Sequence, residues 1–387
     1  LREQVIINYI SMLMNGKEKL FLAKTHTALK NLKRRIQYQD GHAKFISADS
    51  FSKSRDMTKY DIIFIDECST IDNRIMDGVL KKIHSDTLLV LAGDIHQIEA
   101  IDFGNWFFYA KEIIKEKGAS VELVNTWRTE DEVLISLWDE IRDKKFMITE
   151  KLALDGPFSA EIGKELLEQK EEDEVVLCLN YDGKFGLNNM NNYFQCANKK
   201  GEPVIWEEWT YKIGDHILFN ESQRFPILHN NLKGVIAGIE KAKTKIKFTI
   251  DVDMLLTDAE CRKYEIEYVC SDAKSTRISF DVCHFDHNVT EDKEEWMKMH
   301  SVVPFQLAYA ISIHKAQGLE YDSVKVVIPD SNSERITHGI FYTAVTRAKR
   351  KLKIYWSSET MQEIVQRFSG ETSREKSLEI IREKLVQ

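Results

Sequence analysis

About the first 145 residues alternate between amphipathic helices and short apolar runs. Helical periodicity predicts helices over residues 2–14 and 25–37, and the second of these is basic. Compact apolar runs predict buried strands at residues 19–23, 43–48, 61–65 and 87–92. Continuous apolar strands are typical of parallel sheets that helices cover on both faces. The alternation therefore predicts an α/β unit.

The pattern changes after Gly156 and Pro157. A helix is expected over residues 160–170, followed by a buried strand over 174–180. From residue 206 to 285 apolar and polar positions alternate with a period of two. Strands with this period are expected at residues 215–219, 245–250 and 264–268. Short alternating strands separated by turn residues predict a small antiparallel barrel inserted into the chain.

The α/β character returns beyond Asp286. The remaining segments predict buried strands at residues 325–328 and 352–356, and charged helix over 359–387. With 43% hydrophobic and 30% charged residues, the 387-residue chain has a globular composition with room for about two or three domains. No apolar run approaches the roughly 18 residues of a membrane helix, so we expect no membrane segment and a cytoplasmic location.

The cysteine pattern and the net charge bear on two kinds of function, zinc binding and nucleic-acid binding. The six cysteines are scattered without a C-x-x-C pair, which indicates reduced, packed thiols rather than a zinc site. The net charge of -8 argues against attraction of the whole chain to nucleic acid. Any such contact therefore depends on local basic clusters, which occur at residues 24–35 and 347–353. Either cluster alone is more typical of a solvated face.

Two adjacent carboxylates, Asp66 and Glu67, follow the apolar run at 61–65. The carboxyl edge of a sheet is where α/β proteins bind ligands. There, Asp66 can hold Mg²⁺, and Glu67 can orient and deprotonate a water for attack on a γ-phosphate. A strand followed by two acids also occurs by chance, so this pair alone does not establish a site.

A second apolar run, at residues 87–92, also ends in a polar turn with Gly93 and Gln97. The Gln97 side chain is long enough to hydrogen-bond a terminal phosphate and to touch a neighbouring domain, which suits a sensor of nucleotide state. The alternative is an ordinary turn between a strand and a loop. The two sites together are harder to explain by chance than either alone.

The order of these segments resembles that of superfamily 1 helicases, and most closely the RecD-like branch. Residues 66–69 are similar to motif II and residues 93–97 to motif III. The later helicase motifs IV, V and VI are matched by residues 125–129, 309–320 and 342–349. The resemblance covers nearly the whole chain.

The resemblance assigns roles to residues in these motifs. It makes Arg128 the arginine that reaches the γ-phosphate, and Arg347 a second arginine finger that reaches across the cleft between two lobes. A planar guanidinium that is always charged suits this task better than an ammonium group. In motif V, the residues implied to approach the nucleotide are Gln317, Gly318 and Glu320. Those implied to contact the nucleic-acid backbone are Ser312, His314 and Lys315.

An earlier segment is similar to motif Ia, in which a turn after a strand grips a phosphate of single-stranded DNA. Its candidate contacts are Lys24, Thr25 and His26. A plain strand-to-helix connection is the alternative. Residues 211–220 and 230–234 resemble the inserted barrel of RecD-like helicases.

The fold that the resemblance implies is α/β, with two RecA-like parallel-sheet lobes and an inserted small, SH3-like antiparallel β-barrel. Residues 1–150 are expected to form the first lobe, truncated after its phosphate loop. Residues 151–205 and 286–387 are expected to form the second lobe, and residues 206–285 the inserted barrel.

The implied function is that of an ATP-dependent DNA helicase or translocase. Such a motor core uses ATP and Mg²⁺ and moves on single-stranded DNA, in the 5′ to 3′ direction for the RecD-like branch. RNA as the substrate is not excluded, because contacts to a single-stranded backbone tolerate either sugar. The alternative is an ATPase-inactive, helicase-derived subunit that binds single-stranded nucleic acid or a protein. A protein partner is left open, with the charged C-terminal helix as a candidate docking element.

The family's motif I, G-x-x-x-x-G-K-[ST], does not occur in the chain. Gly16 and Lys17 are followed by Glu18 and come after the first helix, so Gly16 is expected to be a helix C-cap. Since the phosphate loop of this family precedes the first helix, we expect it just upstream of Leu1.

We therefore expect the 387-residue chain to hydrolyse ATP weakly or not at all. The backbone N–H cradle and the lysine of the phosphate loop are the main support for the β-phosphate and for Mg²⁺. A version extended upstream is expected to hydrolyse ATP. DNA-stimulated ATPase measured on both versions tests this expectation, and strong turnover by the shorter one contradicts it.

Overall fold

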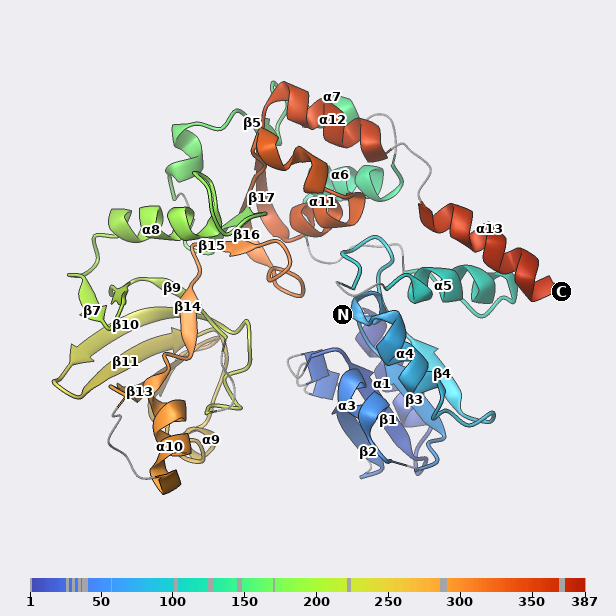
Figure 1. Cartoon of the computed structure of the whole chain (residues 1–387), viewed down its shortest axis with the longest axis horizontal. Coiled ribbons are helices and arrows are strands. Elements are labelled where there is room, and N and C mark those ends of the chain that lie inside the picture. Colours follow the sequence, from blue (N-terminus) through green and yellow to red (C-terminus); the bar gives the residue numbers. More distant parts are fainter. Residues whose placement is uncertain are drawn as a thin grey trace. The chain divides into compact units, whose positions relative to one another are not determined.

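The chain is described by a computed structural model in which it forms two compact units (Figure 1). Unit 1 comprises residues 1–158, 331–350 and 358–387, and unit 2 comprises residues 159–330 and 351–357. The structure describes residues 2–25, 28–29, 32–33, 36, 41–56, 58–100, 104–123, 129–144, 148–169, 171–220, 224–285, 291–368 and 373–386.

A four-stranded parallel sheet in the order β2-β1-β3-β4 lies in unit 1. Its strands are β1 (Lys19–Ala23), β2 (Ala43–Ser47), β3 (Ile62–Ile65) and β4 (Leu88–Leu91). All four apolar runs predicted as strands in this part of the sequence are confirmed. The helix predicted over residues 25–37 falls largely outside the described residues.

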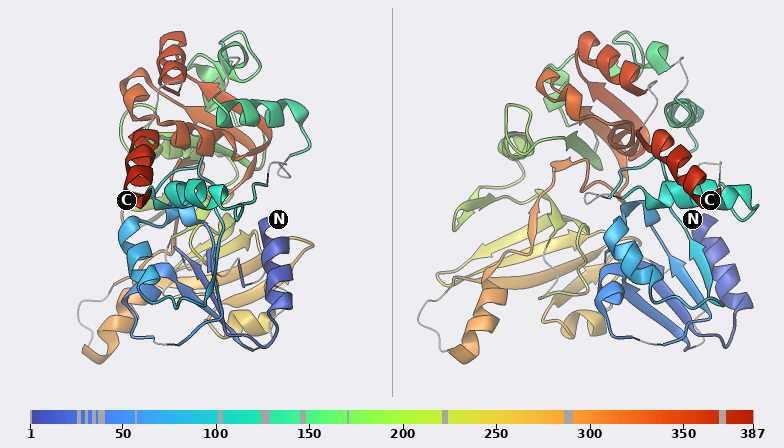
Figure 2. Two further views of the ribbon diagram at one scale, coloured as in Figure 1. Left: turned by 90° about the vertical axis from the view of Figure 1, so that its right-hand side faces the viewer. Right: turned by 45° about the vertical axis from the view of Figure 1, so that its right-hand side comes forward.

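Both faces of this sheet are covered by helices (Figure 2). Successive side chains of a strand point to opposite faces, so Leu20 and Leu22 join one apolar cluster while Phe21 joins the other. The first cluster includes residues of α3 (Ala48–Lys53) and α4 (Asn73–Leu80). The second includes Ile7 of α1 (Arg2–Leu13). This two-sided burial explains why the strands read as continuous apolar runs.

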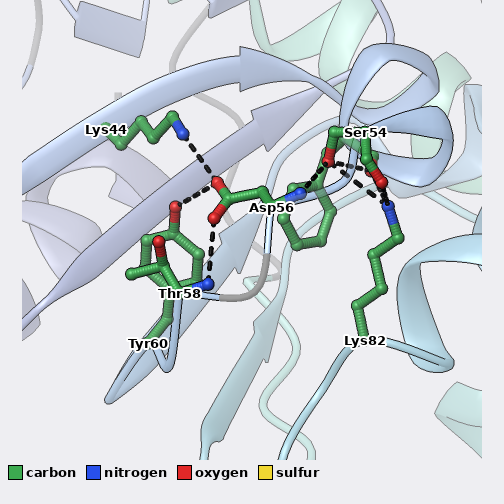
Figure 3. A network of polar contacts seen from close by, with 7 residues as sticks. Lys44, Ser54, Asp56, Thr58, Tyr60 and Lys82 are labelled. Carbon is green, nitrogen blue, oxygen red and sulfur yellow. Dashed lines mark hydrogen bonds and ion pairs between the residues drawn. The ribbon is translucent and has the colours of Figure 1, made fainter.

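The connection from α3 to β3 is held by polar contacts (Figure 3). The Asp56 carboxylate accepts hydrogen bonds from Lys44 Nζ at 2.6 Å and from the Tyr60 hydroxyl at 2.8 Å. The hydrogen bond from Lys44 is the largest cause that lowers the pKa of Asp56. Lys82 Nζ donates to the carbonyl of Ser54, the C-cap residue of α3. These contacts tie the connection to β2 and to the chain after α4.

Further helices complete unit 1. They are α5 (Trp106–Glu116), α6 (Glu132–Arg142), α7 (Ile148–Leu152), α11 (His338–Val345), α12 (Ser358–Phe368) and α13 (Ser373–Val386). Two short 3-10 segments are η1 (Cys68–Thr70) and η3 (Asp330–Arg335). The α6 and α11 helices contact each other, and Trp138 Nε1 donates to Val345 O at 3.1 Å. Gly16, in the turn after α1, has a φ of +73°, a left-handed conformation that suits glycine. Its role as a helix C-cap stays a prediction.

Unit 2 holds a five-stranded sheet in the order β15-β6-β16-β17-β5, in which β6 pairs in parallel with β15 and β16. Its strands are β5 (Ser159–Ala160), β6 (Glu174–Cys178), β15 (Ala310–Ser312), β16 (Tyr321–Val327) and β17 (Ala348–Tyr355). The α8 helix (Leu187–Ala197) covers one face, with Met190 and Phe194 in the same apolar cluster as Val176. The Asn191 side chain exchanges two hydrogen bonds of 2.9 Å with the backbone of Ala310.

The helix predicted over residues 160–170 is wrong. Ala160 belongs to β5, and only the 3-10 turn η2 (Lys164–Leu167) follows. Ser159 and Ala160 pair with Ile354 and Tyr355 of β17, and the Lys325 ammonium donates to the carbonyls of Leu166 and Glu168. A helix over residues 160–170 would have used the Leu166 carbonyl internally. A pairing with a distant strand and a distant lysine thus outweigh local helix propensity.

A six-stranded antiparallel sheet in the order β12-β13-β11-β10-β9-β14 forms the rest of unit 2. Its strands are β9 (His216–Phe219), β10 (Lys233–Lys241), β11 (Lys245–Val252), β12 (Glu267–Ser271), β13 (Thr276–Cys283) and β14 (Phe305–Leu307). The elements beside it are the hairpin β7 (Val204–Trp206) and β8 (Trp209–Tyr211), α9 (Asp258–Arg262) and α10 (Glu291–Ser301).

The period of two is confirmed in β11, where Ile246, Phe248 and Ile250 are buried and the residues between them are not. The strand predicted at 264–268 starts only at Glu267, because Ile266 N donates back to Cys261 O and closes a turn. β14 joins this sheet from beyond the predicted limits of 206–285. Among the described residues, no helix is long and apolar enough to cross a membrane.

A buried ion pair in the five-stranded sheet gives a first prediction. Lys325 Nζ lies 2.8 Å from Glu174 Oε1, with side chains 5% and 4% exposed. Lys325→Met removes the cation beside a buried carboxylate, so we expect a loss on the order of 3 kcal/mol in the free energy of unfolding. Urea unfolding measures it. The matched control Lys245→Met, on β11, breaks a partly exposed pair with Asp281 of β13 and should cost much less. Equal losses for both variants contradict the prediction.

Candidate active site

The motif II carboxylates lie where β3 ends. Asp66 N donates to Leu22 O at 2.9 Å, which continues the parallel pairing one residue beyond the strand. Glu67 N donates to Asp66 Oδ1 at 2.9 Å. Glu67 has a φ of +52°, a left-handed conformation that is uncommon outside glycine. The chain therefore turns sharply at these two half-buried carboxylates, at the carboxyl edge of the sheet.

The motif III turn lies directly beside motif II. Ala92 N donates to Ile65 O and Cys68 N donates to Ala92 O, both at 2.9 Å. A Cβ atom at Gly93 would lie 2.9 Å from Phe107 Cε1 and 3.0 Å from the Cys68 nitrogen. Glycine is therefore required where these two turns and α5 meet. Sequence reasoning was right to expect the two polar turns at one edge of the sheet.

Gln97 is oriented by Asp94 within the motif III loop. Gln97 Nε2 donates to Asp94 Oδ2 at 3.0 Å, while His96 N donates to Asp94 Oδ1 at 2.9 Å. One carboxylate thus fixes both the backbone and the side chain of this loop.

The helix of motif VI packs on this loop. Ile98 N donates to Thr343 Oγ1 of α11 at 2.9 Å. On the preceding turn of α11, a Cβ atom at Gly339 would lie 2.9 Å from Gln97 O. The close approach of α11 thus depends on a glycine, and the hydroxyl of Thr343 satisfies a buried amide that the loop leaves open.

Arg347 is 1% exposed and lies in unit 1, as do Asp66, Glu67 and Gln97. Its Nε donates to Thr343 O at 2.8 Å and one terminal nitrogen donates to Thr346 Oγ1 at 3.0 Å. Thr343 therefore contacts the motif III loop through its hydroxyl and Arg347 through its carbonyl. Arg128, the other predicted arginine, lies outside the described residues.

Two histidines and a tyrosine surround the same junction. The ring of His96 lies 6.2 Å from His338 and 6.0 Å from Tyr342, between centroids. His338 Nε2 donates to Ile141 O at 2.7 Å. Burial lowers the pKa of His338 to about 4, and burial also lowers the pKa of His96. Both imidazoles are therefore neutral at pH 7.

Arg374 of α13 holds the other side of the loop. Its guanidinium lies 2.8 Å from Glu99 Oε1 and 3.4 Å from Ile95 O, over the ring of Phe108. The charged C-terminal helix predicted as a docking element thus makes an ion pair within unit 1. That helix as a partner site stays a prediction.

Motif V lies in unit 2, in the turn after β15. Lys315 N donates to Ser312 Oγ at 3.2 Å, and Lys315 Nζ donates to Gln306 Oε1 at 2.5 Å. Burial lowers the pKa of Lys315. His314 is exposed in the same turn. The structure thus brings the three predicted contacts to the nucleic-acid backbone together at one strand end.

The residues of motif V that are predicted to contact the nucleotide come next in the sequence. Gln317 N donates to His314 O at 3.3 Å, and Gly318 has a φ of +79°. Only glycine adopts such a φ without strain, so the turn before Glu320 requires it. Glu320 O accepts a hydrogen bond from Lys233 Nζ at 2.7 Å.

Motif Ia is described in part. Thr25 Oγ1 accepts a hydrogen bond from Ala28 N at 3.1 Å, and Lys24 Nζ lies 3.9 Å from Asp72 Oδ2. His26 lies outside the described residues. The two described candidates are adjacent at the carboxyl end of β1, on the edge where β3 ends in Asp66.

Three contributions were not predicted from the sequence: the close packing at Gly339, the contact of Arg374 with the motif III loop, and the link that Thr343 makes between that loop and Arg347. A glycine inside the apolar helix of motif VI is the one signal that was available, because glycine in a helix often marks close packing. Contacts between a loop and helices more than 200 residues away leave no trace in local periodicity.

Comparisons with known proteins agree with these motifs. An AAA domain model matches residues 10–156, and a UvrD-like helicase C-terminal domain model matches residues 307–355. The RecBCD enzyme subunit RecD of Mycolicibacterium smegmatis is 23% identical over 340 residues, covering 80% of this chain and 52% of that protein. The ATP-dependent RecD2 DNA helicase of Deinococcus radiodurans is 21% identical over 301 residues, covering 75% of this chain and 35% of that protein.

A solved structure shows the same fold. Pif1 helicase from Bacteroides, in complex with ADP-AlF3 and single-stranded DNA, matches with a TM-score of 0.50 and 14% identity, over 99% of this chain and 97% of that chain. The chain thus has the fold of a helicase motor domain. Its resemblance to the RecD-like branch of superfamily 1 is confirmed. It spans about half the length of the Mycolicibacterium RecD that it matches.

Thr343 gives a prediction for the junction of motifs III and VI. Thr343→Val keeps the shape of the side chain but leaves Ile98 N without its acceptor, so we expect a loss of about 1–3 kcal/mol in the free energy of unfolding of unit 1. Thr343→Ser keeps the hydroxyl and should retain slow hydrogen exchange at the Ile98 amide. The idea fails if both variants exchange this amide at the wild-type rate.

His338 gives a prediction on pH. Its pKa is about 4 in the folded chain, below the usual histidine value of about 6.5, so the unfolded chain takes up the proton first as the pH falls. We expect stability to fall by on the order of 2 kcal/mol from this group between about pH 6.5 and pH 4, and to level off below. Urea unfolding at several pH values should show a flatter profile for His338→Gln. An identical profile would speak against the prediction.

Proposed function

We propose that this chain is the motor core of an ATP-dependent DNA helicase or translocase that moves on single-stranded DNA. The observation that carries the proposal is the joining of three motifs within unit 1. Motif II and the motif III loop share the carboxyl edge of one sheet, and the motif III loop is hydrogen-bonded to the helix of motif VI. An ATPase that converts nucleotide state into movement needs such a connection.

Mg²⁺ and ATP fit the residues at this edge. Among the described residues no group of three or more His, Cys, Asp or Glu side chains could hold a metal alone. Mg²⁺ is commonly held by one or two carboxylates together with substrate phosphates and waters, and Asp66 supplies such a carboxylate. When bound, the metal would neutralise charge on the phosphate oxygens.

The chain's own residues then have distinct tasks. Glu67, turned out of the strand direction by its left-handed backbone, orients and deprotonates the attacking water. Gln97 senses the terminal phosphate and passes its state to α11 through the backbone of the next residue, Ile98. Arg347 and Arg128 supply guanidinium charge to the transferred phosphoryl group. Gln317, Gly318 and the Glu320 region form the second part of the nucleotide site.

Single-stranded DNA is proposed to contact two turns at strand ends. Lys24, Thr25 and His26 form the first contact, and Ser312, His314 and Lys315 form the second. Hydroxyl, imidazole and ammonium groups donate to phosphate oxygens without reading sequence. The Bacteroides Pif1 helicase was solved with single-stranded DNA, which supports DNA as the ligand.

The finer architecture and the direction of movement belong to the same proposal. The antiparallel sheet of unit 2 is proposed to be the SH3-like insert of RecD-like helicases, between two RecA-like lobes. Movement is proposed to run from 5′ to 3′, as the RecD-like resemblance implies. Weak or absent ATP turnover by these 387 residues, which contain no motif I sequence, belongs to the same proposal.

Two measurements test the proposal. Fluorescence anisotropy with a labelled oligothymidylate should show binding by this chain, weakened about tenfold by the double variant Ser312→Ala, Lys315→Ala, because two phosphate contacts are lost. The control Lys298→Ala, in an exposed ion pair with Glu294 on α10, should bind like the wild type. In a version extended upstream, Glu67→Gln should abolish DNA-stimulated ATPase while oligonucleotide binding persists.

The outcomes test the nucleic-acid part and the ATPase part of the proposal separately. No binding to DNA or to a matched oligouridylate contradicts the nucleic-acid part. Preference for oligouridylate replaces DNA by RNA as the substrate. Binding without ATPase in the extended version supports instead the ATPase-inactive binding subunit.

A further inference from the structure

The segment 230–234, which leads into β10, reaches a part of unit 2 that belongs to motif V. Asn231 has a φ of +65°, a left-handed turn that precedes the strand. Lys233 is the first residue of β10, paired with Leu218 of β9. Its backbone therefore belongs to the antiparallel sheet, while its side chain ends at the motif V turn.

The ammonium of Lys233 has three partners outside the antiparallel sheet. Nζ donates to Glu320 O at 2.7 Å and to Asp173 Oδ1 at 2.8 Å, and it lies 3.8 Å from the centre of the Tyr321 ring. The Lys233 side chain is 21% exposed. Charge-assisted hydrogen bonds and a cation over an aromatic face are stronger when water is partly excluded.

Asp173 extends this contact along the motif V segment. Its Oδ2 accepts a hydrogen bond from Asp322 N at 3.1 Å, and its carbonyl accepts one from Ser323 N at 3.1 Å. Asp173 and Lys233 together thus hold the backbone of residues 320–323 in place, where the motif V turn passes into β16.

The turn also has local contacts of its own. Leu319 N donates to Ala316 O at 3.0 Å, and Gly318 reverses the chain with its positive φ. The Glu320 carbonyl that follows accepts the hydrogen bond from Lys233. An ammonium at the end of a four-carbon stem is suited to this, because it can donate to a carbonyl and a carboxylate at once.

We propose that Lys233 is a positioning residue that sets the geometry of the motif V turn from the antiparallel sheet, and that couples the two. The coupling rests on the proposed function, which assigns Gln317, Gly318 and Glu320 to the nucleotide. A shift of β10 would move the Glu320 carbonyl with it. Lys233 thereby links the sheet to the nucleotide end of the motif V turn, whereas Gln306 of β14 contacts Lys315 at the start of that turn.

Hydrogen exchange on this chain tests the contact without any ligand. Lys233→Met keeps the length and apolar stem but removes the donor, and we expect the amides of residues 319–323 to exchange about tenfold faster. Lys233→Arg, which can still donate to both partners, should restore most of the protection. The control Lys245→Met, on the neighbouring strand β11, should leave these amides unchanged. Wild-type exchange in Lys233→Met overturns the proposal.

A second arm of the experiment tests the coupling between the antiparallel sheet and the motif V turn, separately from the ordering of that turn. An oligothymidylate of about 16 nucleotides is added to the wild type and the variants, and exchange of the 317–323 amides is compared with and without it. We expect the oligonucleotide to slow exchange there in the wild type and in Lys245→Met, but not in Lys233→Met at saturating oligonucleotide. An equal response in Lys233→Met overturns the coupling.

The two arms separate the proposals. If the wild type binds no oligonucleotide, the proposed function fails, while the ligand-free arm still decides whether Lys233 orders the turn. If binding occurs and Lys233→Met exchanges like the wild type in both arms, the proposed function stands and the role of Lys233 falls.

Discussion

The hydrogen bond from the Ile98 amide to the Thr343 hydroxyl is the contact on which the account of unit 1 depends. It joins a loop next to the motif II carboxylates to a helix 245 residues further along the chain. Gly93 and Gly339 allow the close approach on either side of this loop, because a Cβ atom at either position would meet backbone or ring atoms at about 2.9 Å. Asp94 and Arg374 hold the loop from within and from α13.

These contacts connect motifs II, III and VI, which are far apart in the sequence. A change of one hydrogen bond at Gln97 can reach Thr343 through the adjoining peptide, and Arg347 through the Thr343 carbonyl. His96 and His338, beside the junction of motifs III and VI, are half-buried and uncharged at pH 7. In unit 2 the motif V turn has a comparable link to the antiparallel sheet, made by Lys233 and Asp173.

Much of the fold could be predicted from the sequence because its strands are continuous apolar runs. Both faces of β1 and β3 are buried, so the strand signal is local and strong. The error at residues 160–170 arose because Lys325 and the pairing with β17 act from far away. Asp66, Glu67 and Gln97 were found from the polar turns that follow apolar runs, and the other motif residues by resemblance. Gly339, Thr343 and Arg374 act through contacts that periodicity does not report.

The most direct test of the central claim is hydrogen exchange of unit 1 with and without saturating Mg²⁺ and ATP, in a version that contains the phosphate loop. If Asp66, Glu67, Gln97 and Arg347 serve one nucleotide site, the amides at 66–68, 94–98 and 343–347 should become protected together. Protection confined to one of these segments, or to none, would contradict the account.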